Sequence, residues 1–146
     1  MSHAIQRIIP GFIAGAVSVL TFHQGIIGTF HVLRLISFAP FPSGLMGPLH
    51  VPFVFDLAFW GGCWGALFGL VAPRLPGSRL AQGVGLGLIA AATSWFVVAP
   101  LKGAPVADGG HVHALVMSAI INGFWGIGVV LILDAIAGRG GAVARR

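Results

Sequence analysis

Hydrophobic residues fall into four long runs that fill most of this chain, covering roughly residues 8–33, 52–72, 80–101 and 114–136. A transmembrane helix needs about 20 mainly apolar residues, so each run is long enough to cross a bilayer. Prolines, glycines and charged residues gather between the runs, where turns are expected. The pattern predicts an all-α membrane protein, a four-transmembrane-helix bundle in which successive helices run up and down.

The connections between these runs are too short to fold alone, so residues 1–146 are predicted to form a single transmembrane domain. Composition agrees with lipid as the solvent, because 57% of the residues are hydrophobic and 8% are charged. In water such a chain would expose more apolar surface than its polar residues could shield. We therefore expect a multi-pass protein with the lipid bilayer as its surroundings.

Basic residues lie mainly at one set of span ends, and cytoplasmic loops typically carry such an excess. Six lie at this set of ends, namely Arg7, Arg74, Arg79, Arg139, Arg145 and Arg146. The two others, Arg34 and Lys102, lie at the opposite ends. Both termini are therefore predicted to be cytoplasmic, as an even number of spans allows. Topology explains the formal charge of +5, and no nucleic-acid partner is predicted.

The connections differ in character. The outer one, residues 37–50, contains prolines and glycines that prevent a long helix, yet it also carries apolar residues that need cover. These are Phe38, Phe41, Leu45, Met46 and Leu49. The membrane interface, the end of the bundle or a partner subunit could each supply the cover. The inner connection, residues 73–79, is short and turns at Pro76–Gly77, which predicts that the second and third spans are antiparallel neighbours.

Glycines recur at four-residue spacing inside the spans, and such steps let helix backbones approach closely where lipid supplies no hydrophobic force. The steps are Gly11 with Gly15, Gly61 with Gly65, Gly65 with Gly69, and Gly83 with Gly87. They predict a tight bundle, and self-association or packing against other membrane subunits through glycine faces. A short match between residues 59–61 and 124–126, both Phe-Trp-Gly, leaves a parallel internal repeat open.

Trp60, Trp64 and Trp125 are predicted to lie near the bilayer midplane, although tryptophan usually marks the interface. They either fill space opposite glycines or line an aromatic pocket for a lipid, quinone or tetrapyrrole ring. Each buried indole N–H needs an acceptor. The candidates for that role are Asn122, Thr93 and Ser94.

Polar residues that could form a binding site lie toward the predicted outer side. They are His23, Gln24, His31, His50, Asp56, His111 and His113. His23 and Gln24 are costly in hydrocarbon and should face the bundle interior. Gln24 and His31 are two helical turns apart, so they share a face that we expect to point inward.

Several roles remain open for these groups. Converging histidines, with Asp56 or Asp108, could bind copper or zinc or relay protons, but their spacing does not identify metal ligands. Haem held by two histidines needs a second imidazole at the depth of His23, and the sequence offers none. The metal is thus unknown, and no cofactor is required by the sequence.

The carboxylates have simpler expected roles. Asp56 lies in the first turns of the second span, where the helix dipole favours a negative charge. Arg34 or a histidine is expected to pair with it. Asp134 ends the fourth span and is expected to be solvated or to reach Arg139.

Two stretches, Thr21–Gln24 (TFHQ) and Phe59–Gly65 (FWGGCWG), resemble the patterns of small, uncharacterised four-span inner-membrane proteins of proteobacteria. The resemblance implies a four-helix integral membrane protein in a bacterial inner membrane. It implies no activity.

No stretch matches a well-specified catalytic motif, so no catalytic residue is predicted. The first hypothesis is a non-catalytic accessory or structural component of a larger membrane complex, with the outer connection as its docking surface. The second is a small transporter or binding protein whose His, Gln and Asp residues line a polar site open to the outer side. The third is a metal- or haem-binding redox protein.

Overall fold

Long helices make up most of the computed structural model, which describes residues 5–46 and 50–143. The first span is α1 (Ile5–Ser18), the π-helical segment η1 (Val19–His23) and α2 (Gln24–Val32). The second is α3 (Phe53–Val71) with the 3-10 turn η2 (Ala72–Arg74). The third is α4 (Arg79–Thr93), the π-helical segment η3 (Ser94–Val98) and α5 (Ala99–Leu101). The 3-10 segment η4 (Val106–Gly110) leads into α6 (Val112–Val143), which forms the fourth.

Four stretches of the described chain are long and apolar enough to cross a membrane, namely Ile5–Val32, Phe53–Arg74, Arg79–Leu101 and Val112–Gly138. The predicted number of long apolar helices is confirmed, and their bounds differ from the prediction by a few residues. In the first connection, β1 (Leu45–Met46) pairs antiparallel with β2 (Val51–Pro52). Apart from this short strand pair, the regular secondary structure of the described residues is helical, as the hydrophobic pattern predicted.

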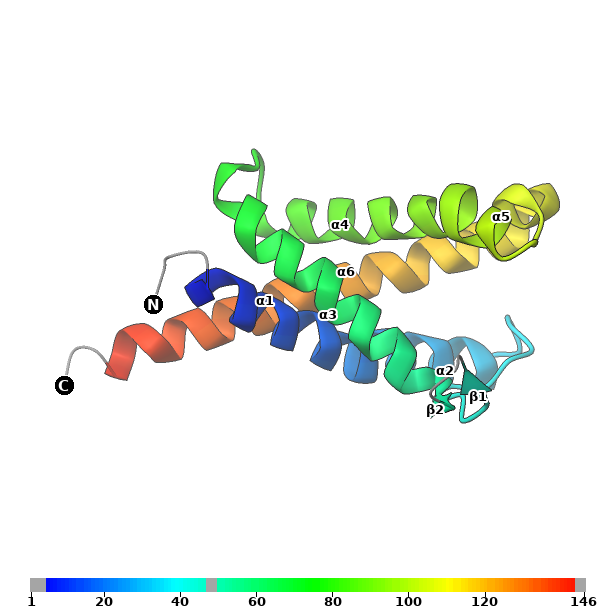
Figure 1. Ribbon diagram of the computed structural model, residues 1–146, viewed down its shortest axis with the longest axis horizontal. Coiled ribbons are helices and arrows are strands. Elements are labelled where there is room, and N and C mark those ends of the chain that lie inside the picture. The colour runs from blue at the N-terminus through cyan, green and yellow to red at the C-terminus, as the bar shows by residue number, and fades with distance from the viewer. Residues whose placement is uncertain (1–4, 47–49, 144–146) are drawn as a thin grey trace.

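The helices pack in the order α3, α1, α6, α4, so that α1 and α6 lie in the middle and α3 and α4 flank them. Figure 1 shows α3 and α4 close together at their connecting turn and then diverging along their length. The prediction that the second and third spans are neighbours is therefore wrong beyond the turn. We call the opening between α3 and α4 the seam. The seam exists because α3 and α4 each direct their glycines toward an inner helix and not toward one another.

Glycine contacts hold each outer helix against its inner partner. A methyl group on Gly11 or Gly15 of α1 would overlap the carbonyl oxygen of Gly65 or Gly61 in α3. The predicted tight packing is confirmed, because only the absence of these side chains lets the backbones approach so closely. These glycines are buried within the chain, so any contact with another subunit must use a different surface.

Helices α1 and α3 form a first hairpin, and α4 and α6 form a second hairpin that is built in the same way. A methyl group on Gly83 or Gly87 of α4 would overlap the carbonyl oxygen of Gly126 or Asn122 in α6. By these contacts, residues 61 and 65 of the first hairpin correspond to residues 122 and 126 of the second. Trp64 therefore corresponds to Trp125. The sequence match of residues 59–61 with residues 124–126 differs from this structural correspondence by about one helical turn.

Trp125 connects the two hairpins at the centre of the molecule. Its side chain is 3% exposed, and its Nε1–H donates a hydrogen bond of 3.0 Å to the carbonyl oxygen of Gly15. The Ser18 hydroxyl donates in return to the Trp125 carbonyl oxygen at 2.6 Å. For Trp125, the acceptors expected on the third and fourth spans are therefore wrong. The Gly15 carbonyl serves because no side chain covers it.

An ion pair joins α4 and α6 near the termini. Arg79 donates to both carboxylate oxygens of Asp134, with Nη2 2.6 Å from Oδ1. Asp134 was expected to be solvated or to meet Arg139, whose side chain lies outside the described part, and its partner is Arg79. Because the two side chains are 39% and 50% exposed, the pair contributes about 0–1 kcal/mol.

Substitution of single glycines tests the close packing. We expect Gly65→Ala to lower the free energy of unfolding by about 1–3 kcal/mol, because the new Cβ would lie 2.8 Å from the Gly15 Cα. Gly85→Ala is the matched control, since a Cβ at Gly85 meets nothing within 4 Å and alanine favours a helix by up to about 1 kcal/mol. Unfolding in detergent, followed by circular dichroism, measures both. Equal effects of the two substitutions would refute the packing argument.

Candidate functional site

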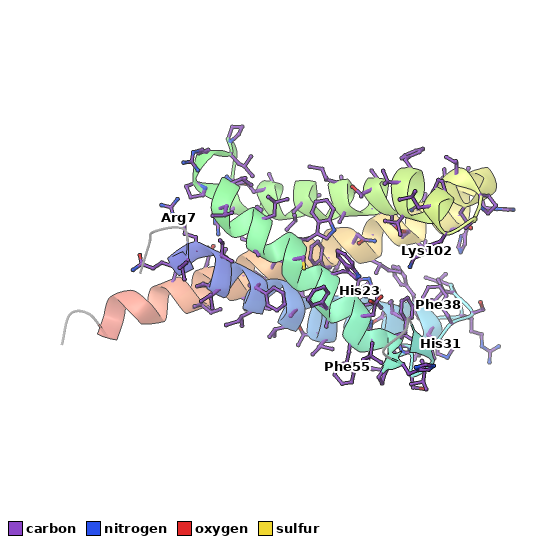
Figure 2. All side chains as sticks on the ribbon, in the orientation of Figure 1. Arg7, His23, His31, Phe38, Phe55 and Lys102 are labelled. Carbon is purple, nitrogen blue, oxygen red and sulfur yellow. The ribbon has the colours of Figure 1, made fainter. Side chains whose placement is uncertain are left out.

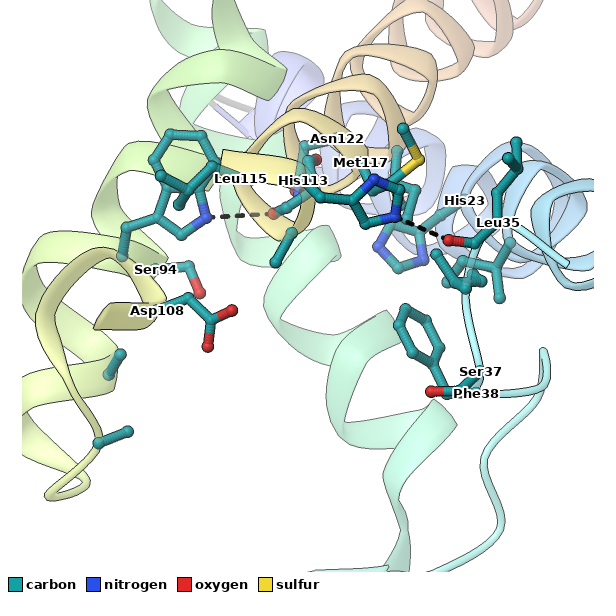
Figure 3. A pocket seen from close by; sticks show the side chains of 18 of the residues that line it. His23, Leu35, Ser37, Phe38, Ser94, Asp108, His113, Leu115, Met117 and Asn122 are labelled. Atoms are coloured by element: carbon teal, nitrogen blue, oxygen red, sulfur yellow. Dashed lines mark hydrogen bonds between the residues drawn. The ribbon is translucent and has the colours of Figure 1, made fainter. Parts of the chain in front are cut away.

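Two adjoining cavities lie in the half of the bundle remote from the termini. The seam cavity, of about 370 Å³, lies between α3 and α4 and has residues of η1 and α6 as its floor. The end cavity, of about 630 Å³, lies between the segment that follows α2, the end of the third span and the start of α6. His23, Ser94 and Asn122 line both cavities. Figure 3 shows them in the wall of one of these cavities, together with His113 and Asp108.

Both π-helical segments contribute to this junction. His23 is the last residue of η1, and Ser94 is the first residue of η3. A π turn inserts an extra residue into a helix, is rare, and often occurs at functional sites because it changes the direction of side chains locally. Hydrophobic periodicity did not predict these segments, since both ends of each span remain helical and apolar.

The predicted inward orientation holds for Gln24, which is 1% exposed. Its Oε1 accepts a hydrogen bond of 2.6 Å from the Phe41 backbone N–H and so fixes the outer connection to the bundle. Its Nε2 lies 3.3 Å from Nδ1 of His23. Because an amide nitrogen only donates, Nδ1 accepts and the neutral imidazole carries its proton on Nε2. His23 is thereby oriented where it lines the two cavities.

The other predicted histidines do not join His23 as a group. His31 is exposed in the last turn of α2, so the prediction that it faces inward is wrong, because this turn lies at the end of the bundle (Figure 1). His50 is also exposed and has a positive φ of 48°. His111 bonds through Nδ1 to the carbonyl oxygen of Asp108 in its own connection.

His113 has a structural contact and also lines the end cavity. Its Nε2–H donates a hydrogen bond of 2.8 Å to the Leu35 carbonyl oxygen, which ties the start of α6 to the end of the first span. Among the described residues, no three His, Cys, Asp or Glu side chains converge. The histidines therefore do not assemble the multidentate metal site considered from the sequence.

Asp56 lies in the first turn of α3, as predicted, and is half-buried. Within the described part of the chain it forms no ion pair with Arg34 or a histidine. It lines the seam cavity instead, as does Lys102 at the end of the third span. A carboxylate and an ammonium group thus belong to the same cavity, contributed by the two helices that flank the seam.

Two of the three predicted midplane tryptophans line the seam from α3. Trp60 is 58% exposed, whereas Trp64 is half-buried. Trp125 forms part of the floor, where it also fills the space beside Gly61. Trp125 thus fills space opposite a glycine, whereas Trp60 and Trp64 line one wall of the seam cavity.

Sequence reasoning missed Trp95 and Ser118, and it considered Ser94 and Asn122 only as acceptors for the tryptophans. Trp95, one residue beyond Ser94, donates from Nε1 to the Ser118 hydroxyl at 3.2 Å and links η3 to α6. Asn122 donates to the Ser118 carbonyl oxygen at 2.9 Å, and its Oδ1 has no hydrogen-bond partner among the described residues. A signal was present, since Ser94, Ser118 and Asn122 are polar residues inside predicted spans.

Comparison of the chain with protein-family models, curated proteins and solved structures finds no match. The chemistry of the site therefore rests on its own geometry. Three residues with hydrogen-bonding side chains line both cavities, apolar and aromatic side chains cover most of the walls, and opposite charges lie in the seam. This arrangement suits a molecule with a small polar head and an apolar body.

Proposed function

We propose that the protein is a membrane-embedded binding protein for an amphipathic molecule that enters from the lipid phase through the seam. The observation that carries this proposal is the junction of two cavities at His23, Ser94 and Asn122. Each cavity lies within the range of about 300–1,000 Å³ that is usual for ligand pockets. The polar head binds at the junction, and the apolar body lies along Trp60 and Trp64.

The arrangement of the helices supports access from the side. Since α3 and α4 do not pack along their length (Figure 1), a ligand can pass between them without breaking a helix contact. His23 supplies an Nε2–H donor, and Asn122 supplies an Oδ1 acceptor. In a region without bulk water, such unpaired polar groups favour a ligand that can hydrogen-bond to them.

Filling the junction tests this function. Ser94→Phe places an aromatic ring at the contact of the two cavities, whereas Val97→Phe adds one at an exposed position of the same η3 segment that lines neither cavity. The delipidated proteins are incubated with a lipid extract of bacterial membranes and analysed by native mass spectrometry. Wild type and Val97→Phe should retain one defined molecule per chain, and Ser94→Phe should retain it about tenfold less, a loss of 1.4 kcal/mol.

Two results would contradict the proposal. The first is that the wild-type protein holds only a mixture of phospholipids in the proportions of the extract. The second is that the two variants retain the same molecule equally. Elution of both variants as single species in detergent shows that the fold is intact.

The proposed setting is a bacterial inner membrane with both termini on the cytoplasmic side. The described chain begins and ends at the same end of the bundle, where Arg7, Arg74 and Arg79 also lie, whereas Arg34 and Lys102 lie at the other end (Figures 1 and 2). The excess of arginine at the end that holds the termini is the excess of positive charge expected at a cytoplasmic surface. The seam and end cavities are then in the outer half of the membrane.

Labelling of single cysteines tests this topology. In a Cys63→Ser background, a membrane-impermeant maleimide added to intact spheroplasts should modify Ser43→Cys. Ser78→Cys should react only after the membrane is permeabilised. Both positions are exposed, so equal access from outside, or the reverse pattern, would exclude the proposed orientation.

A second candidate function is that of an accessory subunit in a larger membrane complex. The observation that favours it is the outer connection, where Phe38, Phe41 and Leu45 are 55%, 55% and 62% exposed although Gln24 holds the segment in place. Ordered, exposed apolar side chains at one end of a bundle are suited to contact another protein.

Substitution in the outer connection separates this function from ligand binding. If the protein is a subunit, mild detergent extraction should recover it in a fixed ratio with other chains. Leu45→Ser, at an exposed position that lines neither ligand cavity, should abolish this fixed ratio. Ser94→Phe should leave it unchanged. A protein that purifies alone under the same conditions, and binds its ligand alone, would rule out the accessory role.

A further inference from the structure

A third cavity lies at the opposite end of the bundle, near the termini. It has a volume of about 620 Å³ and is bounded by the ends of all four spans. Its polar lining comes from Gln6, Arg7, Arg79 and Gln82. Its apolar lining includes Pro10, Leu75, Leu133 and Ile136. None of its lining residues takes part in the seam or end cavities.

The two arginines of this cavity are held differently. Arg79 is fixed by Asp134, donates from Nη1 to Gln82 Oε1 at 3.1 Å, and lies 5.6 Å from the centre of the Phe68 ring. Gln82 in turn donates to the Leu75 carbonyl oxygen at 2.8 Å. Arg79 and Asp134 form the one ion pair among the described residues, so no described carboxylate pairs with Arg7. The cavity therefore combines a rigid polar wall with a cation that lacks a described carboxylate partner.

The charge of this end of the molecule favours an anion. Arg7, Arg74 and Arg79 all lie there, and Asp134 is the only acidic residue of the sequence at the same end. Figure 2 shows Arg7 at this end, remote from Lys102. Basic pockets between transmembrane helices are suited to the phosphate of an acidic lipid, because the apolar lining receives its acyl chain and the cation receives its headgroup.

We propose that this cavity binds an acidic phospholipid of the adjoining leaflet, with its phosphate at Arg7 and the upper part of one acyl chain against Leu133 and Ile136. A free phosphate ion would use the cation and leave the apolar lining in contact with water. A zwitterionic lipid would use the apolar lining but would bring its own cation close to Arg7. An acidic phospholipid satisfies both parts of the cavity.

Arg7 and Arg74 form a matched pair for the test. Both are exposed arginines at the same end of the bundle, but Arg74 does not line the cavity, and its Nη1 donates to the Leu70 carbonyl oxygen in its own helix. The full chain is delipidated in a neutral detergent and titrated with dioleoylphosphatidylglycerol or dioleoylphosphatidylcholine, and native mass spectrometry reports the bound fraction. Arg7→Gln should weaken phosphatidylglycerol binding about fivefold, the effect of one cation near a lipid surface.

Arg74→Gln should change that affinity by less than about twofold, because any surface charge contributes only through screened, long-range attraction. Arg7→Lys retains the charge and should keep most of the affinity. Inorganic phosphate in large excess should not displace the lipid. Equal losses in Arg7→Gln and Arg74→Gln would overturn the proposal in favour of diffuse attraction. Equal binding of phosphatidylcholine, or displacement by phosphate alone, would also overturn it.

Circular dichroism and a single elution peak show whether each variant is folded. The proposal is independent of the seam ligand, since Ser94→Phe alters neither lining nor charge of this cavity and should leave phosphatidylglycerol binding unchanged. Its failure and the failure of the proposed function are therefore distinguished in the same set of proteins.

Discussion

Backbone contact between glycine-bearing helices is the constraint on which the rest of this structure depends. In lipid, helices gain little from hiding apolar side chains, so close van der Waals contact must hold them together. The chain meets this requirement twice, where Gly11 and Gly15 meet α3 and where Gly83 and Gly87 meet α6. Each contact commits two helices to one another. The molecule is consequently two tightly closed hairpins rather than four equivalent helices.

The way in which the hairpins join follows from this. With their glycine faces already used, the hairpins meet through α1 and α6, where Trp125 and Ser18 exchange hydrogen bonds with the facing backbones. That contact lies on one side of the bundle only. The other side, between α3 and α4, stays open, and the seam is a direct result of satisfying three helix contacts but not the fourth.

The two ends of the bundle have different chemistry. At the end near the termini, arginines surround a cavity with an apolar inner wall, which is suited to an acidic lipid. In the other half, His23, Ser94 and Asn122 present neutral hydrogen-bonding groups between apolar and aromatic walls. Arginine is the charged residue that lines the cavity near the termini, whereas the seam cavity is lined by one carboxylate and one ammonium group, Asp56 and Lys102.

The sequence by itself determined the number of helices, their approximate bounds, the close glycine packing and the burial of Gln24. These properties depend on hydrophobic run length, on side-chain size and on the cost of a polar group in hydrocarbon, all of which are local. The tertiary structure alone decided which helices are neighbours, that Gly15 rather than Asn122 accepts from Trp125, and that His31 is exposed while His23 lines two cavities. These outcomes depend on where a helix ends relative to its neighbours and on the π turns that redirect side chains. No periodicity along a single chain segment encodes either quantity.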